Sequence, residues 1–292
     1  MGAKDVRRVG VVGCGIMGSG IAEILARVGC AVVVVEASEE LLASGLGRID
    51  SSLGSAVEHG KLDPAERDAT RSRIGGSTDL SALADVDLVI EAATEDEAAK
   101  REIFAQLNEI VRPDVVLASN TSSVPIGHLA AATGRGDRVV GMHFFNPPTR
   151  MELVELIPTE STSPDTLALV RGVAERLGKT VVFSKDRAGF IVNRLLVPYL
   201  MGAIRVLEEE TATREDIDTA VRLGLGHPMG PLALADLIGL DVLLAIGEIL
   251  ARELAERGSE APGLLRRMVA EGRLGRKSGA GFYEYPARGA PA

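Results

Sequence analysis

The sequence has few of the features that staple, export or anchor a protein. It contains only two cysteines, Cys14 and Cys30, in 292 residues, which excludes a small secreted fold held together by disulfides. No apolar leader with a small-residue cleavage site precedes the first predicted strand, and no uncharged run reaches the roughly 18 residues of a transmembrane helix. We therefore expect a cytoplasmic protein with no membrane partner.

An excess of positive charge and a clustered set of metal ligands are also missing. The net charge is −9, which argues against a dedicated nucleic-acid binder, because such binders neutralise phosphates with surplus lysine and arginine. The four histidines, His59, His128, His143 and His227, have no compact metal-binding spacing, so we expect no metal. With 46% hydrophobic and 25% charged residues, the composition is that of an ordered globular chain.

The first part of the chain alternates two kinds of segment. Continuously apolar strands are predicted at 8–12, 32–35, 87–91, 115–119, 139–144, 153–157 and 180–184. Amphipathic helices are predicted between them at 16–28, 39–58, 97–111, 126–132 and 164–177. Strands that are apolar on both faces and alternate with helices are typical of a parallel sheet covered on both sides. We therefore predict an α/β, Rossmann-type doubly wound sheet.

After Lys185 the pattern changes, because no convincing strand follows. Helices are predicted at 190–210, 215–223, 232–237, 241–257 and 263–271. We place a domain boundary between residues 185 and 186, so that domains of 1–185 and 186–292 are expected, the second of them all-α.

A glycine-rich turn directly follows the first predicted strand and opens a helix. Gly13 would permit the tight turn, Gly15 would let the backbone approach a pyrophosphate, and Gly18 would let the helix pack close to the strand. The first helical residues, Ile16 and Met17, would then face the phosphates with the positive end of the helix. The same turn occurs in unrelated doubly wound folds, so the pattern needs a second feature.

That second feature is Glu36, which ends the second predicted strand 23 residues after Gly13. A carboxylate there accepts hydrogen bonds from ribose hydroxyls and repels a 2′-phosphate, so NAD is favoured over NADP. Cys14 lies between two of the glycines, and we interpret it as a small buried side chain rather than a redox switch.

His143 is the histidine best placed for chemistry. It ends a predicted strand, and ligands of open α/β sheets bind beyond that edge. Glu155 follows in the next strand and could hold one ring nitrogen while the other acts as a base. A histidine near a strand end is more often structural, and residue patterns alone leave both interpretations open.

Several motifs occur in one order over about positions 7–285. They are Gly13–Gly20, Glu95 with Lys100, Ser119–Ser123, His143–Pro147, Leu153–Glu155, Gly189–Arg194, Gly226–Pro231 and Lys277–Tyr283. Together they resemble the L-3-hydroxyacyl-CoA dehydrogenase family, and within it the 3-hydroxybutyryl-CoA dehydrogenases. The resemblance implies an NAD-dependent oxidoreductase of fatty acid metabolism that oxidises (S)-3-hydroxyacyl-CoA reversibly to 3-oxoacyl-CoA.

The resemblance also implies roles for individual residues. His143 would take the proton of the 3-hydroxyl group, Glu155 would stabilise the imidazolium, and Ser122 and Asn193 would contact the substrate oxygens. From the residues alone, Ser122 is also a plausible cap or turn residue. Beyond the glycine-rich turn and Glu36, the implied cofactor contacts are Glu95, Lys100, Ser122, Asn146 and Lys277. The implied substrate contacts are Ser52, Lys61, Ser122 and Asn193, with Lys61 in doubt because the chain departs from the family around His59–Lys61.

Other functions remain open at this stage. The same chemistry could act on an acyl-carrier-protein thioester or a sugar acid, because the headgroup lies away from the reacting centre. The related 3-hydroxyisobutyrate-type enzymes use a lysine where this chain has Gly189, and a non-catalytic NAD-binding protein is disfavoured by the His143 and Glu155 pair. Apolar segments of the helical domain and the resemblance together favour a homodimer.

Overall fold

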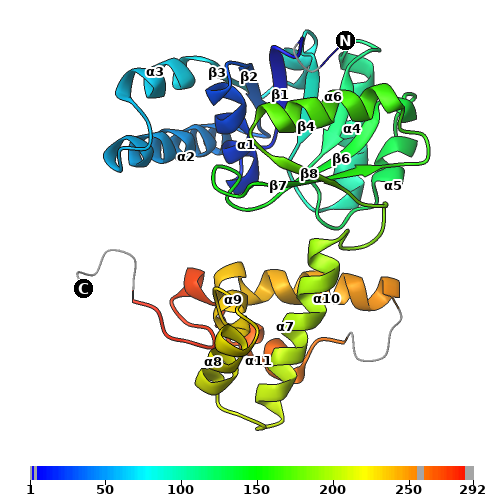
Figure 1. The fold of residues 1–292 in the computed structure, drawn as a ribbon. Coiled ribbons are helices and arrows are strands. Elements are labelled where there is room, and N and C mark those ends of the chain that lie inside the picture. The colour runs from blue at the N-terminus through cyan, green and yellow to red at the C-terminus, as the bar shows by residue number, and fades with distance from the viewer. Residues whose placement is uncertain (1, 3–4, 255–259, 287–292) are drawn as a thin grey trace. The chain divides into compact units, whose positions relative to one another are not determined.

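The computed structural model describes residue 2, residues 5–254 and residues 260–286. The chain divides into two compact units, Met1–Phe190 and Ile191–Ala292 (Figure 1). The first unit is an α/β sheet domain, and the second is built of helices. Within the ranges described, no helix is long and apolar enough to cross a membrane.

The described part of the first unit forms one eight-stranded sheet in the order β3-β2-β1-β4-β5-β6-β7-β8. The strands are β1 (Arg8–Val12), β2 (Ala31–Val35), β3 (Ile74–Ser77), β4 (Leu88–Glu91), β5 (Val116–Ser119), β6 (Val139–Phe144), β7 (Leu153–Pro158) and β8 (Thr180–Phe183). All pairs from β3 to β6 are parallel, as predicted for those among β2, β1, β4, β5 and β6. The prediction of a parallel sheet is wrong at one place, because β7 runs antiparallel to β6. The connection between them holds no helix that could carry the chain back to the other end of the sheet.

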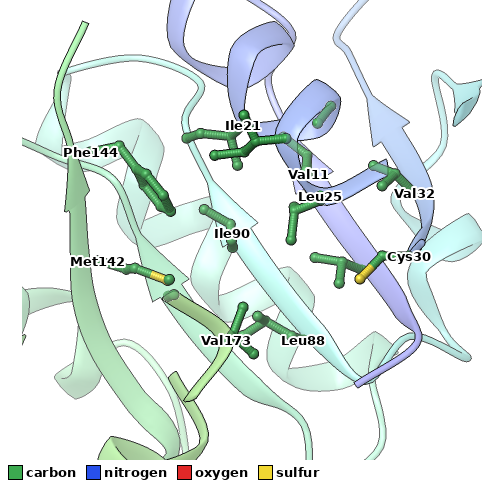
Figure 2. Close-up of a cluster of buried hydrophobic side chains, with 14 of the residues drawn as sticks. Val11, Ile21, Leu25, Cys30, Val32, Leu88, Ile90, Met142, Phe144 and Val173 are labelled. Carbon is green, nitrogen blue, oxygen red and sulfur yellow. The ribbon is translucent and has the colours of Figure 1, made fainter. Parts of the chain in front are cut away.

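Helices cover both faces of this sheet. They are α1 (Ile16–Arg27), α2 (Glu39–Glu58), α3 (Pro64–Ser72), α4 (Glu97–Ile110), α5 (Ile126–Ala131) and α6 (Pro164–Arg176). One buried cluster joins α1 and α6 to the strands, with Ile21, Leu25, Ile90 and Val173 among its members (Figure 2). A second cluster joins α4 and α5 to the strands through residues such as Phe104. Two cores on one sheet explain why its central strands are apolar throughout.

One α-helix and one strand of the first unit were not predicted. Helix α3 has a polar sequence and starts with a capping box, in which the Asp63 carboxylate accepts from a backbone N–H and Glu66 reaches back. Strand β3 contains Gly75 and Gly76, and its side-chain pattern therefore carries no strand signal. A Cβ on Gly76 would lie 2.7 Å from the Leu42 side chain, so the close packing of α2 selects glycine there.

The second unit contains α7 (Val192–Glu208), α8 (Arg214–Gly224), α9 (Pro231–Ile238), α10 (Leu240–Leu254) and α11 (Gly263–Ala270). Helix α7 packs against α9, α10 and α11. The buried core of this unit includes Leu200, Met201 and Ile204 of α7 and Leu243 of α10. Pro198 lies inside α7. No named strand occurs among the described residues after Phe190, as the sequence predicted.

Candidate active site

His143 and Glu155 form a direct pair in the first unit. Nδ1 of His143 lies 2.7 Å from Oε2 of Glu155, whose side chain is fully buried. Nδ1–H therefore donates to the carboxylate, which leaves Nε2 as the nitrogen with a free lone pair. The rings of Phe145 and Phe190 lie 4.7 and 5.5 Å from the imidazole, centroid to centroid, and shield it from water.

The antiparallel pairing of β6 and β7 creates this pair. In that register His143 stands directly opposite Glu155, so the two side chains emerge as cross-strand neighbours. Asn120, which follows β5, accepts the backbone N–H of Phe144 at 2.9 Å and ties the end of β6 to the next strand. A parallel β7 would not have given this register. The one strand whose direction was predicted wrongly therefore supplies a residue of the candidate site.

The glycine-rich turn has the geometry that a dinucleotide requires. Gly13 has φ of 89°, a conformation that side chains rarely adopt, and a Cβ on Gly18 would lie 1.9 Å from the carbonyl oxygen of Gly13. A Cβ on Gly15 would meet nothing within 4 Å, so the space beside it is open. No side chain caps the start of α1 at Gly15. Its first N–H groups therefore remain free to bind phosphate.

Glu36 lies at the far side of this turn. Its carboxylate accepts the backbone N–H of Cys14 at 2.5 Å and that of Ala37 at 3.2 Å. A cavity of about 230 Å³ adjoins it, lined by the ends of β1 and β2 together with Thr78, Leu80, Ala93 and Ile103. A half-buried carboxylate beside a mostly apolar cavity suits an adenosine, so the residues present fit NAD.

A buried ion pair lies at the ends of β4 and β5. Nζ of Lys100 is 2.7 Å from both carboxylate oxygens of Glu91, and each side chain is at most 1% exposed. Oγ of Ser119 donates to the same carboxylate at 2.7 Å. Lys100, which the family resemblance placed against the cofactor, thus faces the protein interior, and Glu91 is a site residue that the sequence did not single out.

Glu95 and Ser122 are brought together beside this ion pair. Oε1 of Glu95 accepts the Ser122 N–H at 2.8 Å and the Ser122 Oγ–H at 2.9 Å, while Oε2 accepts the hydroxyl of Thr121 at 2.7 Å. Nζ of Lys100 is 3.9 Å from Oε2. Three predicted site residues, Glu95, Lys100 and Ser122, therefore belong to one connected cluster.

Ser52 and Lys61 also lie together, on the wall of a separate pocket of about 310 Å³. Arg27, His59 and Arg150 line the same pocket. None of the lining residues is acidic, so a chain with a net charge of −9 gathers three basic side chains here, of which Arg27 is ion-paired with Glu23 at 2.6 Å. Arg150 carries no motif that could have identified it from the sequence. A pocket of this charge and size suits a phosphorylated group.

The remaining predicted residues are spread over both units. Asn146 follows β6 and is exposed. Asn193 and Lys277 belong to the second unit, where Asn193 lies in the first turn of α7 and Nζ of Lys277 is 2.6 Å from Oδ2 of Asp241. Their assignment to the site stays a prediction. Over the ranges described, no group of three or more His, Cys, Asp or Glu residues gathers as a metal site would require.

Two family models match this chain. The NAD binding domain of 3-hydroxyacyl-CoA dehydrogenase matches residues 8–187, and the C-terminal domain of the same family matches residues 189–285. The first match identifies the sheet unit as an NAD-binding domain.

Individual relatives agree with the family models. The chain is 53% identical to a 3-hydroxybutyryl-CoA dehydrogenase of Mycobacterium tuberculosis over 96% of this chain and 99% of that protein. It is 43% identical to the human mitochondrial hydroxyacyl-coenzyme A dehydrogenase, covering 96% and 91%. The crystal structure of (S)-3-hydroxybutyryl-CoA dehydrogenase PaaH1 from Ralstonia eutropha is 46% identical and matches with a TM-score of 0.92 over 97% and 100%. The predicted fold and the resemblance are thus confirmed, and the chain belongs to the 3-hydroxyacyl-CoA dehydrogenase family.

Proposed function

We propose that this chain is an NAD-dependent 3-hydroxybutyryl-CoA dehydrogenase that interconverts (S)-3-hydroxybutyryl-CoA and acetoacetyl-CoA. The observation that carries the proposal is the bond between Nδ1 of His143 and the buried carboxylate of Glu155. It supplies an oriented base in a family whose members share this reaction class.

His143 moves the proton in this mechanism. The 3-hydroxyl group of the substrate gives its proton to Nε2, because Nδ1 already carries the hydrogen that Glu155 accepts. The ring then holds a positive charge, which the adjacent carboxylate stabilises. Bound NAD supplies the hydride acceptor. In the reverse direction the protonated ring returns the proton to the oxygen of the 3-oxo group.

The residues that would hold NAD are those of the first unit whose geometry fits it. The turn at Gly13–Gly18 offers backbone N–H groups to the pyrophosphate, and Glu36 offers acceptors to the adenosine ribose. Glu95, Asn146 and Lys277 remain proposed contacts. Lys100 is buried, so we propose that it acts on the site indirectly, by holding Glu91 and Glu95, and not by contact with NAD.

The pocket around Ser52 supports a CoA thioester as the substrate. CoA carries a pyrophosphate and a 3′-phosphate, and the lining of this pocket includes the cations of Arg27, Lys61 and Arg150. A sugar acid has no such phosphates. An acyl-carrier-protein thioester carries only one phosphate on its arm, so the cationic lining favours CoA.

We also propose a homodimer formed through the helical unit. Large apolar side chains are exposed on it at Leu195, Leu223, Leu225, Leu237 and Val242, and Leu195 is 70% exposed. Such a set is more than a stable monomer usually leaves in water. Multi-angle light scattering that gave a monomer at micromolar concentration would remove this part of the proposal.

The activity is tested by the loss of NADH absorbance with acetoacetyl-CoA. We expect turnover with NADH and acetoacetyl-CoA, and much weaker turnover with acetoacetyl-carrier protein or a 3-oxo sugar acid. NADH binding without turnover of any of these substrates would contradict the proposal and favour a non-catalytic NAD-binding protein.

A further inference from the structure

The linker, residues 184–191, joins β8 to α7 and carries the chain from the first unit to the second. Both carboxylate oxygens of Asp186 accept backbone N–H groups from the first turn of α5. Oδ1 accepts that of Ile126 at 3.0 Å, and Oδ2 accepts that of Gly127 at 2.7 Å. Because first-turn N–H groups have no partner inside their own helix, these bonds cost α5 nothing, and Asp186 anchors the linker to the sheet unit.

Phe190, near the end of the linker, is the last residue of the sheet unit. Its φ is 48°, a left-handed conformation that a bulky residue rarely adopts and that persists only where the surroundings determine it. Its N–H donates to the carbonyl oxygen of Arg187 at 3.0 Å, and the residue is only 5% exposed, in the second core of the sheet. The fold therefore holds this ring in one place in spite of the backbone conformation that this requires.

The Phe190 ring is one wall of the candidate base. Its centroid lies 5.5 Å from that of the His143 imidazole, with the two planes inclined by 59°, and Phe145 supplies a second ring at 4.7 Å. The hydrogen bond to Glu155 fixes the position of one imidazole nitrogen, but a single bond leaves the ring free to swing about it. Packed aromatic rings remove that freedom, because groups in a close-packed interior cannot turn without displacing their neighbours.

We infer that Phe190 is a positioning residue of the proton-transfer pair, and that Asp186 is the anchor that keeps its ring against the imidazole. The inference rests on the proposed function, in which His143 is the base. A reacting group must be held within about 0.5 Å and 10–20° of its productive geometry, and packing is one means of holding it. The linker thus has a task in the reaction in addition to joining the two units.

Phe190→Leu tests the ring itself, because leucine keeps an apolar side chain in the core but has no aromatic face. With acetoacetyl-CoA and NADH we expect kcat to fall about tenfold, less than the 10²-fold that a 1 Å misplacement can cost. KM for acetoacetyl-CoA and the dissociation constant of NADH should change little, since Phe190 contacts the imidazole and not the glycine-rich turn.

Phe104→Leu is the matched control for a purely structural effect. In the part of the chain that the structure describes, the rings beside His143 are those of Phe145 and Phe190, whereas Phe104 of α4 is a fully buried member of the same core. Both leucine variants should lose stability toward urea, because each removes a buried ring. Only Phe190→Leu should lose kcat.

The His143 imidazole can also be observed directly, without any ligand. Protein labelled with ¹³C in its histidine rings gives signals from only four residues, and His143→Gln identifies the signal of His143. An aromatic ring shifts the resonance of a group packed against it, so Phe190→Leu should move the His143 signal and leave that of His59 unchanged. Phe104→Leu should move neither signal.

Asp186→Ala tests the anchor in a variant that leaves the Phe190 ring present. It should move the His143 signal in the same direction as Phe190→Leu and lower kcat by a smaller factor. Combined with Phe190→Leu it should cause no further loss of kcat, because the ring that it holds is already gone. Lys185→Ala removes an exposed neighbour in the linker and should leave kcat and the signal unchanged.

An unchanged kcat in Phe190→Leu, or equal losses of kcat in Phe190→Leu and Phe104→Leu, would overturn the role of Phe190. Losses that multiply in the double variant would overturn the role of Asp186 as the anchor. If Phe190→Leu does not fold, an Asp186→Ala enzyme with wild-type kcat and an unmoved His143 signal would overturn the inference. Failure of the proposed function is separate, because it appears as wild-type protein that binds NADH but does not turn over acetoacetyl-CoA.

Discussion

Two regions near the strand ends of the sheet each contain a fully buried carboxylate. The two carboxylates differ in the partner that each one binds. Between β6 and β7, Glu155 faces His143, whose charge would change in the proposed reaction. At the end of β4, Glu91 faces Lys100 of α4, whose charge takes no part in the proposed reaction. In the proposed reaction the first pair stabilises a charge that forms on the imidazole, whereas the second holds neighbouring groups in place. If the proposal is correct, the partner, rather than burial, decides whether a buried carboxylate serves chemistry or structure.

The largest expected effect is on kcat, and it concerns only the region that contains His143 and Glu155. His143→Gln should lower kcat by about 10²–10⁴, the usual worth of a positioned base, while NADH binding survives. Stopped-flow absorbance of NADH measures the rate, and titration of the variant with NADH measures the binding.

Glu155→Gln is the companion variant for the same pair. The amide still orients the ring but cannot balance its positive charge, so the fold should persist while much of the rate is lost. A Glu155→Gln enzyme with full activity would mean that this carboxylate is structural, as Glu91 is. The two buried carboxylates would then not differ in their roles.

The second effect concerns stability rather than rate. Lys100→Met leaves the Glu91 carboxylate buried without its cation, which should cost about 3–5 kcal/mol of unfolding free energy. Urea denaturation measures this. The double variant Lys100→Met with Glu91→Leu should recover a large part of the loss, since no isolated charge remains. A loss confined to the double variant would contradict the ion-pair interpretation.

A third carboxylate, Glu36, sharpens the comparison because backbone N–H groups hold it rather than a side-chain cation. Glu36→Ala should narrow the preference for NADH over NADPH by about tenfold, the worth of a hydrogen bond to a charged group. The ratio of kcat/KM values measures it. Glu40→Ala, which removes an exposed carboxylate of the same segment, should leave that ratio unchanged. A preference for NADPH in the wild type would reject this role for Glu36.

The smallest effect is an expected lack of reaction at Cys14, next to Glu36. Burial, helped by the Glu36 carboxylate, raises the pKa of this thiol to about 11. The folded protein should therefore resist iodoacetamide at pH 8, with protein unfolded in urea as the control, read by mass spectrometry. Because the folded state retains the proton, this contribution to stability is present below pH 9 and is lost as the pH rises through 11. Rapid labelling of Cys14 in the folded protein would contradict this prediction and favour the interpretation of Cys14 as a redox switch.

The sequence predicted most of the fold because strand and helix signals are local. Continuous apolar runs located every strand except β3, and the glycine spacing with Glu36 predicted a cofactor turn in what the family model identifies as an NAD-binding domain. The direction of β7 was missed, because direction depends on where the connection leads and not on the strand's own residues. Lys100 was predicted to be a site residue, and that remains a prediction. Its ion-pair partner Glu91 was not predicted, since nothing in a linear sequence distinguishes this carboxylate from its neighbours before the chain folds.

The register that places His143 opposite Glu155 has a consequence for how this enzyme could diversify. The two residues are held by ladder bonds between their own strands, so the segment from Pro147 to Glu152 is not needed to bring them together. Nζ of Lys179 binds the carbonyl oxygens of Pro148 and Met151 at 2.6 and 2.7 Å and anchors that segment independently. Natural variation or laboratory selection can therefore lengthen this loop or change its residues, including Arg150 of the cationic pocket, while the His143–Glu155 pair stays unchanged. Under the proposed function, such changes would alter which substrates bind without altering the proton-transfer pair.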